Sequence, residues 1–308
     1  MPYGEMIAIS EQYSPTTSSA LPSHDALGQF WIPLLSIQAV VIASSNALTT
    51  IVFLVNAHLR KRSYYLLINL ALVDFLVGAL MVPIKLDLEN KNAYLEISGR
   101  KYQILIGDTT FCVLYGIISS ASLFSLVCIS LERMCATLWP FLHRTTDIRW
   151  YGVVMTTLWV CAFTFGAIVY WDIYIALVLA TVGVVFALLT ILGSYGAIFL
   201  KVKHQHAEHQ TSQAQRRYQK ERELAKTVLI VTAAAFLCWI PLFVTVFSII
   251  FGLDLPVDVQ MMLTFIQEWN SFANFVIYSM RMPVFRKALY KFVFTCSSDN
   301  AIQPSNGH

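Results

Sequence analysis

The stretch that decides the fold is residues 150–200, WYGVVMTTLWVCAFTFGAIVYWDIYIALVLATVGVVFALLTILGSYGAIFL, in which Asp172 is the only charged residue. As a single α-helix this stretch would be about 75 Å long, at roughly 1.5 Å per residue. The hydrocarbon core of a bilayer is only about 30 Å thick. The stretch therefore predicts two membrane spans that fold back on each other, with a very short turn at Trp171-Asp172.

The rest of the chain repeats this apolar pattern. A helix needs about 20 mainly apolar residues to cross a membrane. The segments of the 308-residue chain that meet this need are 30–57, 64–86, 104–137, 150–170, 173–200, 225–252 and 257–280. The composition agrees, because 57% of the residues are hydrophobic, 13% are charged and the mean hydropathy is +0.62. A soluble domain has about a quarter of its residues charged. We predict an all-α membrane protein with a bundle of seven transmembrane helices, spanning residues 30–282.

Basic residues indicate how this bundle is oriented. They gather in the loops after the first, third, fifth and seventh spans, and the few on the other side are balanced by acidic residues. The positive-inside rule then places the C-terminus in the cytoplasm and the N-terminus outside. Residues 1–29 are predicted to be a disordered extracellular tail. The localisation we expect is the plasma membrane.

An amphipathic pattern follows the last span. In residues 283–294, apolar side chains recur at helical spacing opposite Arg286, Lys287 and Lys291. Such a helix is expected to lie on the inner leaflet with its cations near anionic lipid head groups. Residues 295–308 are predicted to be a cytoplasmic tail. In that tail Cys296 is either a palmitoylation site or a plain free thiol.

Several polar residues fall in the middle of predicted spans. Asp74 lies halfway along the second span, where a carboxylate costs on the order of 2.5–3.5 kcal/mol, so its presence suggests a function. Further polar residues at similar depths are Asn46, Ser122, Asn270, Ser271 and Asn274. Two hypotheses remain open: these groups coordinate a small cation such as Na⁺, or they form a hydrogen-bonded cluster that packs the helices together.

Two further features suggest moving parts. Glu132-Arg133 stands at the inner end of the third span. Arg133 is either a snorkelling anchor or forms a latch, that is, an ion pair with Glu221 near the inner end of the sixth span that holds the cytoplasmic side closed. Pro241 kinks the sixth span beside Trp239, because proline removes a helical hydrogen bond. A latch and a kink together predict a helix whose inner end swings.

Taken together, these residues resemble the rhodopsin-like class of G protein-coupled receptors, over residues 30–294. The matching positions are Asn46, Leu70 to Asp74, Glu132-Arg133-Met134, Trp159, Tyr195, Cys238-Trp239-Ile240-Pro241, Asn274 to Tyr278 and Phe285-Arg286. The resemblance implies a sodium pocket formed by Asp74, Ser122, Asn270 and Asn274. It also implies an activation switch and G protein coupling region that includes Glu132, Arg133, Tyr195, Glu221, Pro241 and Tyr278.

The chain departs from the family pattern in the outer loops and in the seventh span. Phe275 stands where the family's Asn-Pro-X-X-Tyr motif has proline, which leaves open weak or absent coupling. Ala187 is near the place of the usual proline of the fifth span, and Asp108 holds the position of the family's outer cysteine, so no outer disulfide is expected. These loop features are similar to those of the melanocortin, adenosine, cannabinoid and lysophospholipid receptors.

The resemblance also places a ligand site in the outer half of the bundle. Its residues would be Tyr115, Trp239, Phe243, Gln267 and Glu268. Tyr115 stands where amine receptors carry an aspartate, which argues against a standard aminergic receptor. Glu268, with Asp108 and Asp172, would give a negative field that favours a cationic or peptide ligand. Alternatively, Asp108 and Asp172 are solvated charges at the rim.

Other classes of protein fit less well. A transporter or channel would relay ions through Asp74 and Glu268, but the sequence has no internal repeat and no paired broken helices. It also lacks His-Glu-X-X-His, Gly-X-Ser-X-Gly and a phosphate loop, so no enzyme is expected. The expected partners are an extracellular ligand, a heterotrimeric G protein and membrane lipids, with no nucleic acid. No cofactor is expected, apart from Na⁺ as an allosteric ion.

Overall fold

The structure is a computed structural model that describes residues 24–56, 59, 64–90, 95–97, 100–102, 109–206, 237–241, 243–248, 251–253 and 255–299. Asp108, Glu221 and the first half of the predicted sixth span lie outside these residues. Within them, the helices long and apolar enough to cross a membrane are Phe30–Val55, Tyr65–Asp87, Thr109–Leu138, Ile148–Trp171 and Ile173–Lys201. These confirm the first five predicted spans.

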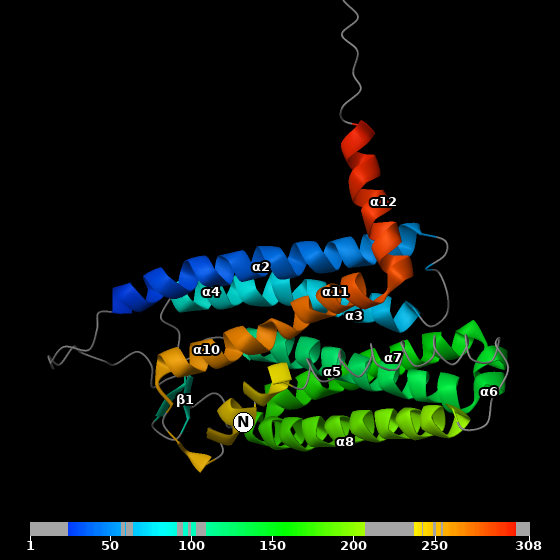
Figure 1. The fold of residues 1–308 in the computed structure, drawn as a ribbon. Coiled ribbons are helices and arrows are strands. Elements are labelled where there is room, and N and C mark those ends of the chain that lie inside the picture. The colour runs from blue at the N-terminus through cyan, green and yellow to red at the C-terminus, as the bar shows by residue number, and fades with distance from the viewer. Residues whose placement is uncertain are drawn as a thin grey trace, which may run out of the picture.

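The helices pack side by side as a bundle (Figure 1). Helix α2 (His24–Val55) lies beside a second span made of α3 (Tyr65–Leu76), η3 (Val77–Met81) and α4 (Val82–Asn90). Helix α5 (Thr109–Leu138) packs against α7 (Ile148–Trp171) and α8 (Ile173–His206). The most apolar window of α5 is 61% buried, against 22% in α7 and in α8. Of these three helices, α5 is therefore the one at the centre of the bundle. Helices α7 and α8 expose much of their apolar surface, as helices that face lipid do.

The sixth and seventh spans complete the bundle. A shorter apolar helix, Leu237–Ser248, falls within the predicted sixth span. Helices α10 (Val257–Glu268) and α11 (Asn270–Arg281) follow each other along the predicted seventh. They are separated at Trp269, whose carbonyl oxygen accepts hydrogen bonds from the backbone N–H groups of both Phe272 and Ala273.

The two ends of the bundle differ. Strands β1 (Leu95–Ile97) and β2 (Arg100–Tyr102) pair antiparallel at one end, which we call the hairpin end. The short helix α6 (Pro140–Thr145) and helix α12 (Pro283–Asp299) lie at the opposite end, which we call the α12 end (Figure 1). Helix α12 leaves the bundle at a steep angle, as a helix lying along a membrane surface would.

The predicted turn between the fourth and fifth spans is confirmed. Helix α7 ends at Trp171 and α8 begins at Ile173. The Asp172 side chain accepts hydrogen bonds from the backbone N–H groups of Tyr174, at 2.8 Å, and Ile175, at 3.0 Å. An aspartate in this position caps the helix by satisfying N–H groups that have no partner inside it.

The second span contains a π-turn that the hydropathy pattern does not reveal. Pro83 has no N–H to donate to the carbonyl of Ala79, and Val82 N–H bonds instead to the carbonyl of Val77, five residues back. A π-turn takes in more residues than an α-turn, so it rotates the face that the following residues present. Lys85 is one of these following residues.

Gly78 allows this π-turn to pack tightly against the first span. A Cβ atom at Gly78 would come within 2.5 Å of the Ala43 nitrogen and 2.9 Å of the Ala39 oxygen. Both are backbone atoms, so no side-chain rotation could relieve the contact. The absence of a side chain at residue 78 therefore lets the two spans approach this closely.

The predicted amphipathic helix is confirmed, with different ends. In α12 Phe285 and Ala288 are buried, whereas Arg286, Lys287 and Lys291 are exposed. The helix continues to Asp299, so it includes the first residues of the segment predicted as a tail, 295–308. Likewise α2 begins at His24, inside the predicted tail 1–29. Both corrections have the same reason: once a helix has formed, each added residue gains a backbone hydrogen bond, whether or not it is apolar.

Candidate functional site

The predicted polar cluster is centred on Asp74, which is fully buried. Ser271 Oγ donates to Asp74 Oδ1 and Asn274 Nδ2 donates to Asp74 Oδ2, each at 2.8 Å. Asn46 Nδ2 donates to the Ser271 carbonyl oxygen at 3.0 Å. The cluster therefore ties the first, second and seventh spans together around one carboxylate.

Two more of the predicted sodium-pocket residues, Ser122 and Asn270, line the same space as Ser271. Ser122 and Asn270 are buried, and neither Ser122 Oγ nor Asn270 Oδ1 has a hydrogen-bond partner among the residues that the structure describes. Asn46 Oδ1 is in the same situation. A buried polar atom left unpaired costs about 1–3 kcal/mol. These oxygens therefore favour a polar guest such as water or a small cation.

A second hydrogen-bonded chain joins three spans. Trp159 Nε1 donates to Asn69 Oδ1, and Asn69 Nδ2 donates to Ser125 Oγ, both at 3.0 Å. Asn69 lies in α3, Ser125 in α5 and Trp159 in α7. The indole of Trp159 thus positions α7 against the second and third spans.

A cavity extends from this cluster into the half of the bundle near the hairpin end. Its polar lining residues are Tyr115, Ser119, Ser122, Trp239, Gln267, Glu268, Asn270 and Ser271, and its apolar ones are Val77, Met81 and Ile118. Tyr115 Oη donates to Gln267 Oε1 across the wall. Four of the five residues predicted to bind a ligand therefore line one cavity, and Ser271 belongs both to this cavity and to the Asp74 cluster.

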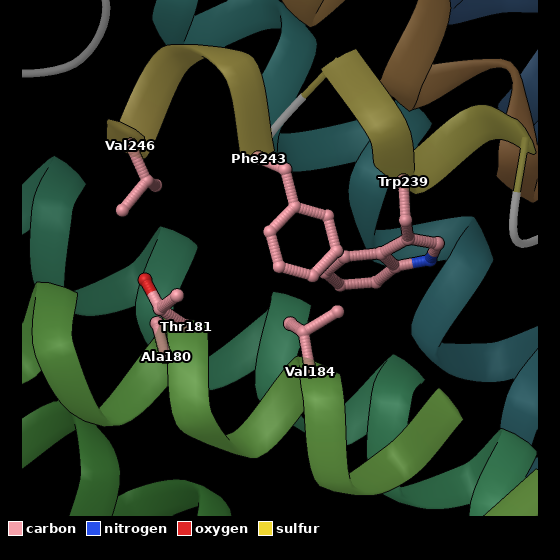
Figure 2. A pocket seen from close by; sticks show the side chains of 6 residues that line it. All are labelled: Ala180, Thr181, Val184, Trp239, Phe243 and Val246. Atoms are coloured by element: carbon pink, nitrogen blue, oxygen red, sulfur yellow. The ribbon is translucent and has the colours of Figure 1, made fainter. Parts of the chain in front are cut away.

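Phe243, the fifth predicted ligand residue, lies on the other side of Trp239. Together with Val246 these two rings face Ala180, Thr181 and Val184 of α8 around a largely apolar pocket (Figure 2). The indole nitrogen of Trp239 points away from this pocket in Figure 2. Since Trp239 lines both spaces, its indole forms the wall between the polar cavity and the apolar pocket.

The structure also reveals a buried ion pair that the sequence analysis missed. Lys85 Nζ lies 3.2 Å from Glu268 Oε1 and donates to Thr264 Oγ1 at 2.7 Å. The two charged side chains are only 8% and 4% exposed. For the orientation of the bundle, Lys85 counts only as one of the few basic residues on the outer side, but the π-turn before it directs it towards the seventh span. Pro83 in an apolar span is the one sequence signal that suggests this change of helical phase.

At the α12 end, Glu132 is the centre of a second polar cluster. Its carboxylate lies 3.1 Å from Arg133 Nε, 2.8 Å from His143 Nε2 and 3.3 Å from the Tyr151 hydroxyl. The sequence analysis named Glu132 and Arg133 but missed His143 and Tyr151. These two come from α6 and α7, and no spacing in the sequence indicates that contact. The predicted partner Glu221 lies outside the described residues, so the Arg133–Glu221 latch stays a prediction.

The remaining predicted switch residues that the structure describes are Tyr195, Tyr278 and Pro241. Tyr195 and Tyr278 belong to one buried apolar cluster, in which the Tyr278 ring centroid lies 6.2 Å from those of Phe53 and Phe285. Pro241 is buried in the sixth span. The side chain of Cys296 lies outside the described residues, so its lipidation stays a prediction, as does the absence of an outer disulfide.

The helix of the seventh span is interrupted at one residue, Trp269, and not at the position of the family's proline. Helix α11 runs through Phe275 to Arg281, and the break in the span falls at Trp269 instead. This break lies directly after Glu268 and directly before Asn270. The discontinuity therefore sits between the ion pair and the Asp74 cluster.

Comparison with known proteins identifies a family. The model of the family "7 transmembrane receptor (rhodopsin family)" matches residues 45–171 and 166–280. Trace amine-associated receptor 9 of Mus musculus is 27% identical, over 83% of this chain and 82% of its own length. Trace amine-associated receptor 2 of Homo sapiens is 28% identical, over 73% and 70%. Lysophosphatidic acid receptor 1-A of Xenopus laevis is 24% identical, over 87% and 76%.

Proposed function

The chain belongs to the rhodopsin family of seven-transmembrane receptors, and on that premise we propose that one end of its bundle binds a ligand and the other binds a G protein. The hairpin end faces the outside of the plasma membrane and admits an extracellular ligand to the cavity lined by Tyr115, Trp239 and Glu268. The α12 end faces the cytoplasm and receives a heterotrimeric G protein. The basic residues exposed along α12 support this orientation, because cytoplasmic segments of membrane proteins carry an excess of lysine and arginine.

The observation that carries the proposal is the continuity between the cavity and the Asp74 cluster. Ser271 lines the cavity and also donates a hydrogen bond to Asp74. A ligand that displaces Ser271 must therefore disturb the contacts that hold the first, second and seventh spans together. It can shift the receptor between two states only by binding one of them more tightly than the other.

A sodium ion fits the Asp74 cluster. The ion would be coordinated by Asp74, Ser122, Asn270 and Asn274, which supply the oxygen atoms that hard cations prefer. This assignment is supported by Ser122 Oγ and Asn270 Oδ1, which have no hydrogen-bond partner in the described residues. The ion would offset the charge of Asp74 and stabilise the resting arrangement of the spans.

The sodium site has a direct test. Purified protein should unfold at a higher temperature in NaCl than in an equal concentration of N-methylglucamine chloride, because the larger cation cannot enter a buried cluster. The difference should vanish in Asp74→Asn. An equal shift in that variant would mean that the salt acts elsewhere.

Activation would move the sixth span. Trp239 touches the ligand cavity, and Pro241 lies two residues further along the same helix, where proline weakens it. A ligand pressing on the indole would tilt this helix and repack Tyr195 and Tyr278 at the α12 end. Arg133 would then leave Glu132 and contact the G protein.

Coupling is tested by screening a ligand library against the full chain in cells that carry sensors for G protein activation. We expect ligand-dependent nucleotide exchange without net ion flux. Arg133→Ala should abolish exchange while ligand binding survives. Arg149→Ala is the matched control, because Arg149 is an exposed arginine at the same end of the bundle. Ligand-dependent ion flux without exchange would contradict the proposal and support a channel.

A further inference from the structure

The geometry points to Glu268 as the anchor for a compact protonated amine, with Lys85 holding the carboxylate in place from outside the cavity. This inference rests on the proposed function and deepens it, because it names the chemical class of the ligand. It differs from the amine site that the family resemblance would suggest, since Tyr115 stands at that position.

The two oxygen atoms of Glu268 have different surroundings. Oε1 faces Lys85, whereas Oε2 is buried and has no hydrogen-bond partner in the described part of the chain. Glu268 lines the cavity, and Lys85 is not among the residues that line it. Lys85 is therefore a positioning residue, which leaves one carboxylate oxygen for a ligand that donates a hydrogen bond.

The charges enclosed by the bundle favour a cation. Among the described residues, the buried charged side chains are Asp74, Lys85 and Glu268. Lys85 compensates Glu268, and the proposed sodium ion would compensate Asp74. The ligand is therefore selected by the group that faces the cavity, which is the unpaired Oε2 of Glu268. A carboxylate oxygen attracts a cation and repels an anion.

The rest of the cavity wall matches an amine on an apolar body. A primary ammonium has three N–H donors, one of which would bond to Glu268 Oε2, and Gln267 lines the cavity beside it. The indole face of Trp239 is a favourable surface for a cation. Val77, Met81 and Ile118 supply apolar contacts for the remainder of the ligand.

The same wall is a poor site for a carboxylate. Lys85, the cation that would bind one, already contacts Thr264 and Glu268 behind the wall. The Tyr115 hydroxyl already donates to Gln267. The donors of the other described lining residues, such as the Trp239 indole N–H and the amide groups of Gln267 and Asn270, are neutral.

The test compares three probes that share one ring and differ in the polar head: benzylamine, benzyl alcohol and benzoate. Binding to the purified full chain in nanodiscs of neutral lipid is measured by thermal stabilisation over a range of probe concentrations. We expect benzylamine to bind about 10- to 100-fold more tightly than benzyl alcohol, the range that a hydrogen bond to a charged group supports. Benzoate should not bind. Equal binding of the amine and the alcohol would overturn the inference.

Two paired variants separate ligand recognition from folding. Lys85→Met/Glu268→Met removes both charges, leaves no unpaired ion and should lose the preference for benzylamine. Lys85→Glu/Glu268→Lys keeps an ion pair but presents an ammonium to the cavity, so it should bind benzoate and reject benzylamine. If the doubly neutral variant still prefers the amine, the anchor is not Glu268.

The outcome is independent of coupling. Benzylamine that binds through Glu268 without promoting nucleotide exchange would support this inference and contradict the proposed function. Some ligands could promote nucleotide exchange with the same potency in every variant at residues 85 and 268. That result would support the proposed function and contradict this inference.

Discussion

The two polar clusters of the bundle are built in opposite ways. Near the hairpin end, Glu268 is buried, has one cationic partner and leaves one oxygen atom unpaired within the described residues. At the α12 end, Glu132 contacts Arg133, His143 and Tyr151, and the first two are about one-fifth exposed. A carboxylate with an unpaired oxygen in the wall of a cavity is suited to receive a ligand. A carboxylate whose partners reach the surface is suited to release one of them to a protein.

This difference predicts that charge changes are far more costly near the hairpin end. Lys85→Met leaves the Glu268 carboxylate buried without a cation, which should lower the free energy of unfolding by about 3–5 kcal/mol. Thermal unfolding of the purified protein measures this loss. Lys85→Met/Glu268→Met should recover most of it, because no charge is then left unpaired. If the double variant is as unstable as the single one, the two residues stabilise the fold independently of their pairing.

Gly78→Ala tests whether the geometry of the second span positions the ion pair. The added Cβ meets backbone atoms of the first span at 2.5 and 2.9 Å, and such overpacking costs about 1–3 kcal/mol. Because the spans must separate, we also expect weaker benzylamine binding. Gly152→Ala is the matched control, since a Cβ there has no neighbour within 4 Å. An equal loss in both variants would point to a general effect of glycine replacement in a helix.

The α12 end should respond in function more than in stability. Glu132→Gln weakens the contacts with Arg133 and His143, which are partly exposed and together contribute about 1 kcal/mol. Basal nucleotide exchange on the G protein should rise a few-fold, because Arg133 is held less firmly. Asp147→Asn, which alters another carboxylate–arginine pair at this end, should leave basal exchange unchanged. A rise in both variants would show that surface charge, rather than the Glu132 cluster, restrains coupling.

The contrast between the two clusters also explains how far the sequence could predict the site. Hydropathy predicted the spans and the Trp171-Asp172 turn, because each follows from membrane thickness. The depth of Asp74, Ser271 and Asn274 in their spans predicted that they would meet, because residues at equal depth in neighbouring helices lie close together.

What the sequence could not predict depends on helical phase and on tertiary contacts. The face on which Lys85 lies is set by a π-turn five residues long, and a regular helical period does not describe it. The contact of His143 with Glu132 depends on how α6 folds back under α5, which has no periodic signal. The three missed residues, Lys85, His143 and Tyr151, are partners of residues that the sequence did identify. Pattern analysis found the carboxylates but not the groups that hold them.

The smallest predicted effect concerns Asp172, an acidic residue that lies at the hairpin end but outside the cavity lining. Since its side chain caps α8, Asp172→Ala should cost about 1 kcal/mol of stability, and Asp172→Asn should cost little because asparagine caps equally well. Both variants should bind benzylamine like the unaltered protein, as measured by thermal stabilisation. The asparagine variant removes the charge without removing the cap. A tenfold loss of benzylamine affinity in that variant would mean that a diffuse negative field at the rim, rather than the buried oxygen of Glu268, selects the ligand.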